Sequence, residues 1–134
     1  MFTLRDVQNR FDEMDVNYRI LNDGTIGLLQ TGKQNFRYMI WLAIEGTICR
    51  AVFYTGVHFP EYNMKVLSKI NEFNKIYKMY SFCVNEEDEN ELILKGYIDI
   101  EYTNDIESVV SLIAIGQRVL DDLYPETQKI IWSN

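Results

Sequence analysis

The sequence predicts an α+β fold in which an antiparallel β-sheet is flanked by helices. Apolar residues recur at helical spacing near the start, in the middle and at the end of the chain, and short β-rich runs broken by turn signals lie between these segments. No repeat, linker or low-complexity segment interrupts them. The expected order is α-β-β-β-β-α-β-β-α, in a single domain that spans residues 1–134.

The first helix is expected from about Thr3 to Met14. Thr3 followed by Asp6 resembles a capping box with aspartate in place of glutamate. Apolar side chains then recur at helical spacing, at Leu4, Val7, Phe11 and Met14. The helix should therefore bury this one face.

A four-strand meander is predicted next, because turn signals stand at 22–24, 31–33 and 45–46. The expected strands are Asn17–Leu21, Thr25–Gln30, Asn35–Ile44 and Thr47–Thr55. The third is apolar on both alternating faces in its second half, which is typical of an interior strand covered on each side.

A second helix from Pro60 to Asn74 is expected to begin with its proline in the first turn. The strands Ile76–Val84 and Glu91–Glu101 should then form a hairpin, since the loop between them is too acidic to bury. In the second of these strands, Leu92 and Leu94 begin a core face, whereas Lys95 and Tyr97 begin a solvent face.

The last helix should start after Thr103-Asn104 and end before Pro125. Its core stripe is already wide, yet further apolar residues lie beside it: Leu112, Ile115, Val119 and Leu123. This surplus predicts either a tail, Ile130-Ile131-Trp132, that folds back over the helix, or a homodimer. Gly116 interrupts the stripe and indicates close packing of the helix backbone against a strand.

Composition excludes several classes of partner. The formal net charge of −7 would repel nucleic acid and an anionic membrane surface. The apolar run from Met39 to Ile44 is far shorter than the ~20 residues that span a bilayer. No secretory signal is evident, and Cys49 and Cys83 are both expected to be small buried side chains, which favours a reduced cytoplasm.

No catalytic, cofactor or metal site is expected. His58 is the only histidine and has no ligand partner at a metal-binding spacing. Asp99 and Glu101 share a strand face at about 7 Å, which suits a carboxylate pair or a hard cation, but such residues more often only solubilise a sheet. The glycines form no phosphate-binding loop. The sequence therefore predicts a protein that is not an enzyme.

The second half of the chain resembles the YbjN-like domain family. The resemblance rests on the run Lys69-Ile70-Asn71-Glu72-Phe73-Asn74, the acidic hairpin, Leu92-Ile93-Leu94 and the long apolar helix. It implies a bacterial α+β domain similar in fold to type III secretion chaperones, described as a putative regulator of sensory transduction without enzyme activity. Asn71 and Asn74 could contact a ligand, but capping the helix and tying it to the next strand is the more common role.

The aromatic residues point to protein binding, because tyrosines and tryptophans in strands cannot all be buried with their polar atoms satisfied. Candidate contact residues are Tyr38, Trp41, Tyr97, Leu112, Ile115 and Val119. The leading hypothesis is a non-enzymatic protein-binding module, chaperone-like or regulatory, that offers an aromatic sheet face or an open edge strand. The alternative is a small-molecule sensor or cryptic enzyme with a pocket between the last helix and the sheet.

Overall fold

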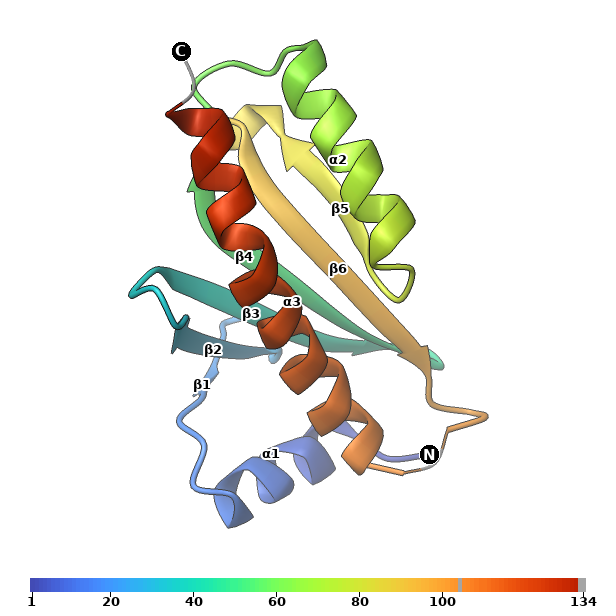
Figure 1. Cartoon of the computed structure of the whole chain (residues 1–134). Coiled ribbons are helices and arrows are strands. Elements are labelled where there is room, and N and C mark those ends of the chain that lie inside the picture. Colours follow the sequence, from blue (N-terminus) through green and yellow to red (C-terminus); the bar gives the residue numbers. More distant parts are fainter. Residues whose placement is uncertain (104, 133–134) are drawn as a thin grey trace.

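The computed structural model describes residues 1–103 and 105–132, and in them the helices cover one side of a six-stranded antiparallel sheet (Figure 1). The elements are α1 (Leu4–Glu13), β1 (Arg19–Ile20), β2 (Ile26–Thr31), β3 (Arg37–Glu45), β4 (Ile48–His58), α2 (Met64–Ile76), β5 (Ser81–Asn85), the short 3₁₀ helix η1 (Glu86–Asp88), β6 (Glu91–Asp99) and α3 (Glu107–Ile131). The strands lie in the order β1-β2-β3-β4-β6-β5. The α+β class and the antiparallel sheet predicted from the sequence are confirmed.

The first helix begins where its sequence predicts. The Thr3 hydroxyl accepts a hydrogen bond from the Asp6 amide at 3.3 Å, and the Asp6 carboxylate accepts one from the Thr3 amide at 2.8 Å. These two bonds satisfy amides that the first turn of a helix leaves unpaired. Val7 and Phe11 are buried in the core cluster, so the predicted apolar face is confirmed.

The four-strand meander is also confirmed, and β3 lies inside the sheet between β2 and β4. Strand β4 runs three residues beyond its predicted end, to His58, and its pairing with β6 shifts register between Tyr54 and His58. At this irregularity Gly56 has φ +72°, and a Cβ there would lie 2.9 Å from the Arg37 carbonyl oxygen. The position therefore requires glycine.

The predicted start of the second helix is wrong. Helix α2 begins at Met64, because the Asn63 side chain accepts a hydrogen bond from the Val66 amide at 3.1 Å and caps the helix there. Pro60 therefore lies outside the helix. The helix continues to Ile76, where a strand was expected, and β5 starts only at Ser81.

The hairpin of β5 and β6 agrees with the sequence pattern. Its acidic tip forms the exposed 3₁₀ helix η1. In β6, Leu92 and Leu94 are completely buried, whereas Lys95 and Tyr97 are exposed. The core face and the solvent face of this strand are therefore as predicted.

The last helix does not end before Pro125, as the sequence predicts, but continues to Ile131. Proline removes one helical hydrogen bond, yet packing beyond it holds the helix together. Thr127 is completely buried and Ile131 packs partly against the core. The expected tail is thus part of α3 and cannot fold back over it.

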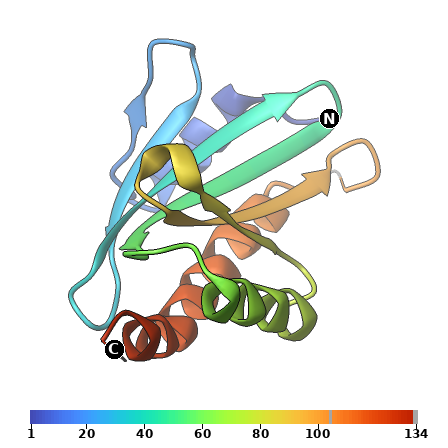
Figure 2. The same cartoon turned by 90° about the horizontal axis from the view of Figure 1, so that it is seen from above.

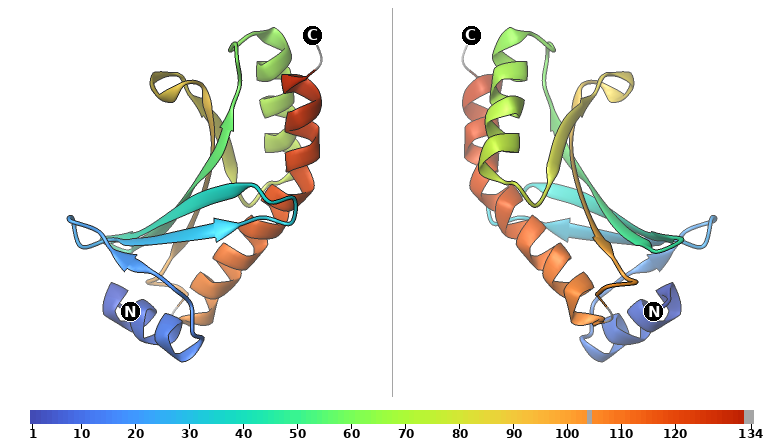
Figure 3. Two further views of the ribbon diagram at one scale, coloured as in Figure 1. Left: turned by 90° about the vertical axis from the view of Figure 1, so that its left-hand side faces the viewer. Right: turned by 90° about the vertical axis from the view of Figure 1, so that its right-hand side faces the viewer.

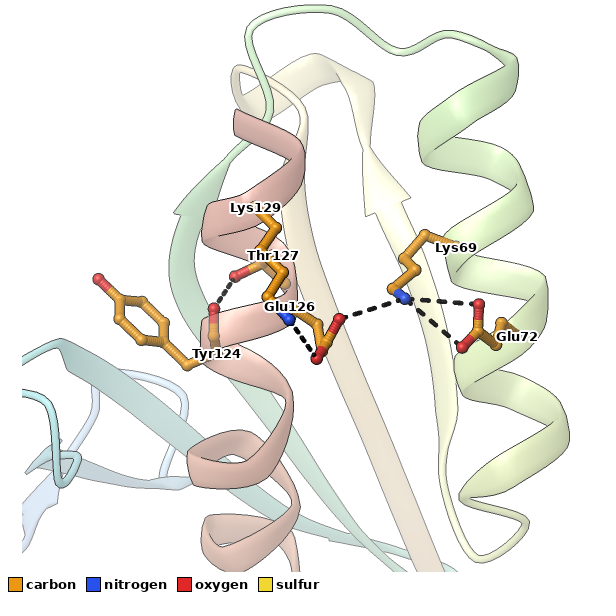
Figure 4. Close-up of polar contacts among 6 residues, drawn as sticks. All are labelled: Lys69, Glu72, Tyr124, Glu126, Thr127 and Lys129. Atoms are coloured by element: carbon orange, nitrogen blue, oxygen red, sulfur yellow. Dashed lines mark hydrogen bonds and ion pairs between the residues drawn. The ribbon is translucent and has the colours of Figure 1, made fainter. Parts of the chain in front are cut away.

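Ion pairs connect the end of α3 to α2 (Figure 4). Lys69 Nζ of α2 lies 3.5 Å from Glu126 Oε2 of α3 and 3.4 Å from Glu72 Oε1, and Lys129 Nζ lies 3.2 Å from Glu126 Oε1. These groups are partly exposed, so solvent screens them and each contributes little to stability. The pair between Lys69 and Glu126 shows that the last turns of α3 lie beside α2.

We expect Pro125→Ala to stabilise the protein by about 1 kcal/mol. Alanine restores an amide that can donate to the Asp121 carbonyl, and it removes a residue that costs about 3 kcal/mol in an ideal helix interior. The gain should be smaller here because proline also restricts the unfolded chain. Urea denaturation of both proteins measures the difference, and a less stable variant would contradict this account of the helix.

The apolar surplus of α3 is covered within the chain, which corrects the expectation from the sequence. Leu112, Val119 and Leu123 are only 3%, 7% and 1% exposed. The twisted strands curve around α3, which runs diagonally beneath them and contacts β4 and β6 (Figure 2). A curved sheet covers a wider arc of a helix than a flat one. The surplus therefore gives no reason for a homodimer.

Candidate functional site

The face of the sheet that points away from the helices is open. Successive strand residues alternate between faces, so the neighbours of core residues such as Leu28, Ile40 and Leu94 point to the opposite side. Figure 3 shows α1, α2 and α3 on one side of the curved sheet. None of these three helices covers the other side, which we call the open face, and only the short η1 at the tip of the β5–β6 hairpin lies on that side in the described residues (Figure 3).

An apolar row crosses the open face from β2 to β5. The pairing register places its members directly opposite one another on successive strands: Leu29, Met39, Tyr54, Ile93 and Cys83. Leu29 is 70% exposed and Met39 38% exposed, whereas Ile93 in the middle is almost buried. The exposed apolar surface of the row therefore lies mainly at Leu29 and Met39, and exposed apolar side chains that adjoin one another are typical of a contact surface.

Basic side chains lie on both sides of the apolar row. Arg37 pairs with Thr31 on one side, and on the other side Arg19 pairs with Gly27 and Lys95 with Val52. Arg50 pairs with Tyr97 one position further along. The acidic Glu45 and Asp99 stand at the far ends of their strands on the same face, with Glu45 Oε1 3.9 Å from Arg50 Nη1. Glu91 lies two residues before Ile93 on the same face of β6, but it is buried and its pKa is raised. The exposed charges beside the row are therefore basic.

Asn74 closes one edge of the sheet. Its side-chain oxygen accepts a hydrogen bond from the Phe82 amide at 2.7 Å, and its side-chain nitrogen donates one to the Phe82 carbonyl at 3.1 Å. These are the backbone groups through which β5 would pair with an added strand. The predicted tie from Asn74 to the following strand is confirmed, but Asn74 lies inside α2 and does not cap its end. Asn71 is exposed and has no described hydrogen bond.

The opposite edge of the sheet offers little more room for an added strand. Strand β1 has only two residues, Arg19 and Ile20, both exposed. An added strand gains affinity from a run of backbone hydrogen bonds, and two residues supply very few. The hypothesis that a partner docks on an open edge strand is therefore poorly supported. The open face is the better candidate for a docking site.

Several residues predicted to bind a partner are buried instead. Tyr38, Leu112 and Val119 are 4%, 3% and 7% exposed and belong to the core, so these three predictions are wrong. Ile115 is half-buried against the core. All four lie on the helix-covered side of the sheet, which sequence periodicity alone could not distinguish from the open side.

Two of the predicted residues do lie on the open face. Tyr97 is 62% exposed. Trp41 is half-buried, and its indole nitrogen donates a hydrogen bond to the Thr25 hydroxyl at 2.7 Å, which holds the ring against the sheet. Leu29, Met39 and Cys83 were missed as surface residues. Cys83 was expected to be buried and is exposed.

The buried thiol and two of the buried tyrosines are held in their neutral forms. Burial raises the pKa of Cys49 to about 12, so the reactive thiolate is disfavoured. Burial likewise raises the pKa values of Tyr38 and Tyr80 to about 12. The Tyr80 hydroxyl donates to the Leu112 carbonyl at 2.6 Å and thereby joins the sheet side to α3. The packing role predicted for Cys49 is confirmed by its complete burial.

A titratable group that the sequence did not single out is Glu91. Its side chain is only 6% exposed and accepts a hydrogen bond from the Gly56 amide at 3.0 Å. Burial raises its pKa and outweighs the Gly56 hydrogen bond, which lowers it; Asp88 raises the pKa further and the charge of His58 lowers it. Asp99, considered earlier as half of a carboxylate pair, accepts a hydrogen bond from the Glu101 amide at 3.0 Å. Across residues 1–103 and 105–132, no cluster of three or more His, Cys, Asp or Glu is placed to hold a metal ion.

Glu91 should make stability depend on pH. Its pKa in the folded protein is raised above the ordinary value of 4.5, so its stabilising contribution is complete below that value and is lost as the pH rises through the folded pKa. Glu91→Gln cannot lose a proton. We expect wild type to lose free energy of unfolding relative to Glu91→Gln as urea denaturation is repeated from pH 4 upward. Parallel pH curves would contradict the raised pKa.

Two shallow pockets bear on the choice between protein binding and small-molecule binding. One, of about 340 Å³, adjoins the apolar row and is lined in part by Leu21, Gly27, Leu29 and Met39. The other, also about 340 Å³, lies between the first half of α3 and β6, where Ile98, Leu112 and Ile115 meet the polar side chains of Ser108 and Ser111. Both volumes are at the small end for a site that binds small molecules.

Comparison with protein-family models and with curated protein sequences found no match. Within the described residues, none of the helices has the length and apolar character needed to cross a membrane.

Proposed function

We propose that the chain is a non-enzymatic protein-binding module, chaperone-like or regulatory, that docks its partner on the open face. The observation that carries this proposal is the apolar row, which crosses five strands while α1, α2 and α3 pack on the other side of the sheet. An uncovered apolar surface of this kind is typical of a protein interface. A role in sensory transduction, as the YbjN-like resemblance implies, is part of the same proposal.

Replacing exposed apolar side chains of the row with charged ones tests the proposal. Leu29→Asp with Met39→Asp places two carboxylates in the exposed part of the row, and both side chains are exposed enough for the fold to survive. The matched control is Met64→Asp with Tyr102→Asp, because these apolar side chains are 76% and 85% exposed but lie outside the sheet. Each tagged protein is used for affinity purification at native expression level.

We expect wild type and the control to retain the same partner, and the Leu29/Met39 variant to lose it. Circular dichroism establishes that the variants are folded. A partner retained by the Leu29/Met39 variant, or no specific partner for wild type, would contradict the proposed function.

A small-molecule sensor or cryptic enzyme is the second candidate, and the pocket between α3 and β6 favours it. A thermal-shift screen of metabolites separates the two functions. A compound that raises the melting temperature in proportion to the logarithm of its concentration, and fails to do so in Ser111→Phe, would support this candidate. Ser111 is exposed on the pocket wall, so phenylalanine fills the space without entering the core.

A further inference from the structure

We propose that the open face binds an acidic amphipathic helix of its protein partner, laid along the apolar row. This inference rests on the proposed function and adds the chemistry and the shape of the occupant. It is carried by the length and direction of the row and by the charges beside it.

The row has the dimensions of a helix face. It crosses β2, β3, β4, β6 and β5 at right angles to the strands. With neighbouring strands about 4.8 Å apart, its ends are about 19 Å apart. A helix of about 13 residues has this length and presents apolar residues at i, i+3, i+4 and i+7 along one side.

An extended peptide fits this surface less well. The backbone groups of the inner strands β2, β3, β4 and β6 already pair with their neighbours, so a peptide lying across them would find no backbone partners. At the edge, Asn74 already occupies the amide and carbonyl of Phe82. A helix satisfies its own backbone and needs only side-chain contacts.

The charges indicate an acidic helix. Arg37 lies on one side of the row, and Arg19, Lys95 and Arg50 lie on the other. The chain as a whole has a formal net charge of −7, so basic residues around the exposed apolar side chains are a local exception. Acidic residues on both flanks of a docked helix would complement them.

The same charges argue against other occupants. A second copy that used the same face would bring two basic surfaces together, which like-charge repulsion disfavours. Nucleic acid would meet the negative charge of the rest of the chain, whose formal net charge is −7. An acidic partner helix agrees with both the charge and the apolar character of the face.

A displayed library of helical 15-residue peptides tests the inference. Each peptide has leucine at i, i+3, i+4, i+7 and i+11, and each flanking position is randomised among Glu, Gln and Lys. Selection is performed on the full-length wild-type chain. We expect the selected peptides to be enriched in Glu at the flanking positions.

Two paired variants locate the selected peptides. Arg50→Glu with Lys95→Glu reverses the charge of the open face, and we expect it to weaken binding by about tenfold in Kd, because two attractions become repulsions. Lys33→Glu with Lys78→Glu makes the same net change at exposed loop residues and should leave Kd unchanged. Binding should also weaken as salt concentration rises.

The outcomes distinguish this inference from the proposed function. Peptides that lose binding in Leu29→Asp with Met39→Asp but show no Glu enrichment, or show Lys enrichment, would overturn the acidic helix while leaving a protein-binding face. Failure to select any peptide that depends on Leu29 and Met39 would overturn both. Tighter binding of a 15-nucleotide single-stranded RNA than of the best peptide would also overturn the inference.

Discussion

Replacing Gly116 by leucine is expected to destabilise the protein by about 3 kcal/mol. A Cβ at this position would lie 2.3 Å from Cζ of Phe53 and within 3.0 Å of two further atoms of that ring. Phe53 is completely buried in the middle of β4 and cannot move aside without disturbing the core. Overpacking of this kind costs about 1–3 kcal/mol, and occasionally more. Urea denaturation measures the loss.

A control on the same helix separates overpacking from a general effect of leucine. Ala114 is exposed two residues earlier in α3, so Ala114→Leu should change stability by only a few tenths of a kcal/mol. A double-mutant cycle adds a positive test, because Phe53→Leu shortens the ring that a Cβ would meet. Gly116→Ala should cost less in the Phe53→Leu background than in wild type. Equal costs in both backgrounds would show that this contact does not limit the site.

Replacing Asn74 by alanine is expected to cost about 2 kcal/mol and to make the protein aggregate on warming. The substitution removes the hydrogen bonds to both the amide and the carbonyl of Phe82, and each such bond contributes about 1 kcal/mol. It also leaves the outer edge of β5 free to pair with another chain. Urea denaturation measures the first effect, and light scattering during a temperature ramp measures the second.

Asn71 provides the matched control for this prediction. It lies nearly one turn earlier in α2, is exposed and has no described hydrogen bond, so Asn71→Ala should leave both measurements unchanged. Asn74→Asp retains the acceptor but turns the donor into a second oxygen opposite the Phe82 carbonyl, and it should be no more stable than Asn74→Ala. A normal unfolding free energy and no aggregation in both Asn74 variants would show that the edge needs no cover.

Local signals predicted well wherever local interactions decide the structure. The capping box at Thr3 and Asp6, the turns of the meander and the alternation along β6 each depend on residues close in sequence. The predicted boundaries failed where a more distant contact decides them. Pro125 marks a helix end locally, but the packing of Thr127 and Ile131 extends α3 past it. Asn63, rather than Pro60, caps α2.

The candidate site could not be read in the same way, because alternation divides a strand into two faces without saying which one a helix covers. Tyr38 and Met39 are neighbours in β3, and both are apolar enough to be core or contact residues. Tyr38 is buried because α3 lies on its side of the sheet, and Met39 is half-exposed because α1, α2 and α3 all lie on that side and leave the other uncovered. The sequence therefore suggested Tyr38 because it is aromatic, and Leu112 and Val119 because they widen an apolar stripe, and it missed Leu29 and Met39.

The sequence by itself determined the class of the fold, the order of its elements, the interior place of β3 and the close approach at Gly116. Periodicity, turn chemistry and the cost of glycine in a helix are properties of neighbouring residues and need no tertiary information. Only the tertiary structure decided that the curved sheet covers the apolar surplus of α3, that Asn74 closes the edge at Phe82 and that Leu29, Met39, Tyr54, Ile93 and Cys83 form one row. These features depend on strand order, register and sheet curvature, which arise when segments distant in sequence pack together.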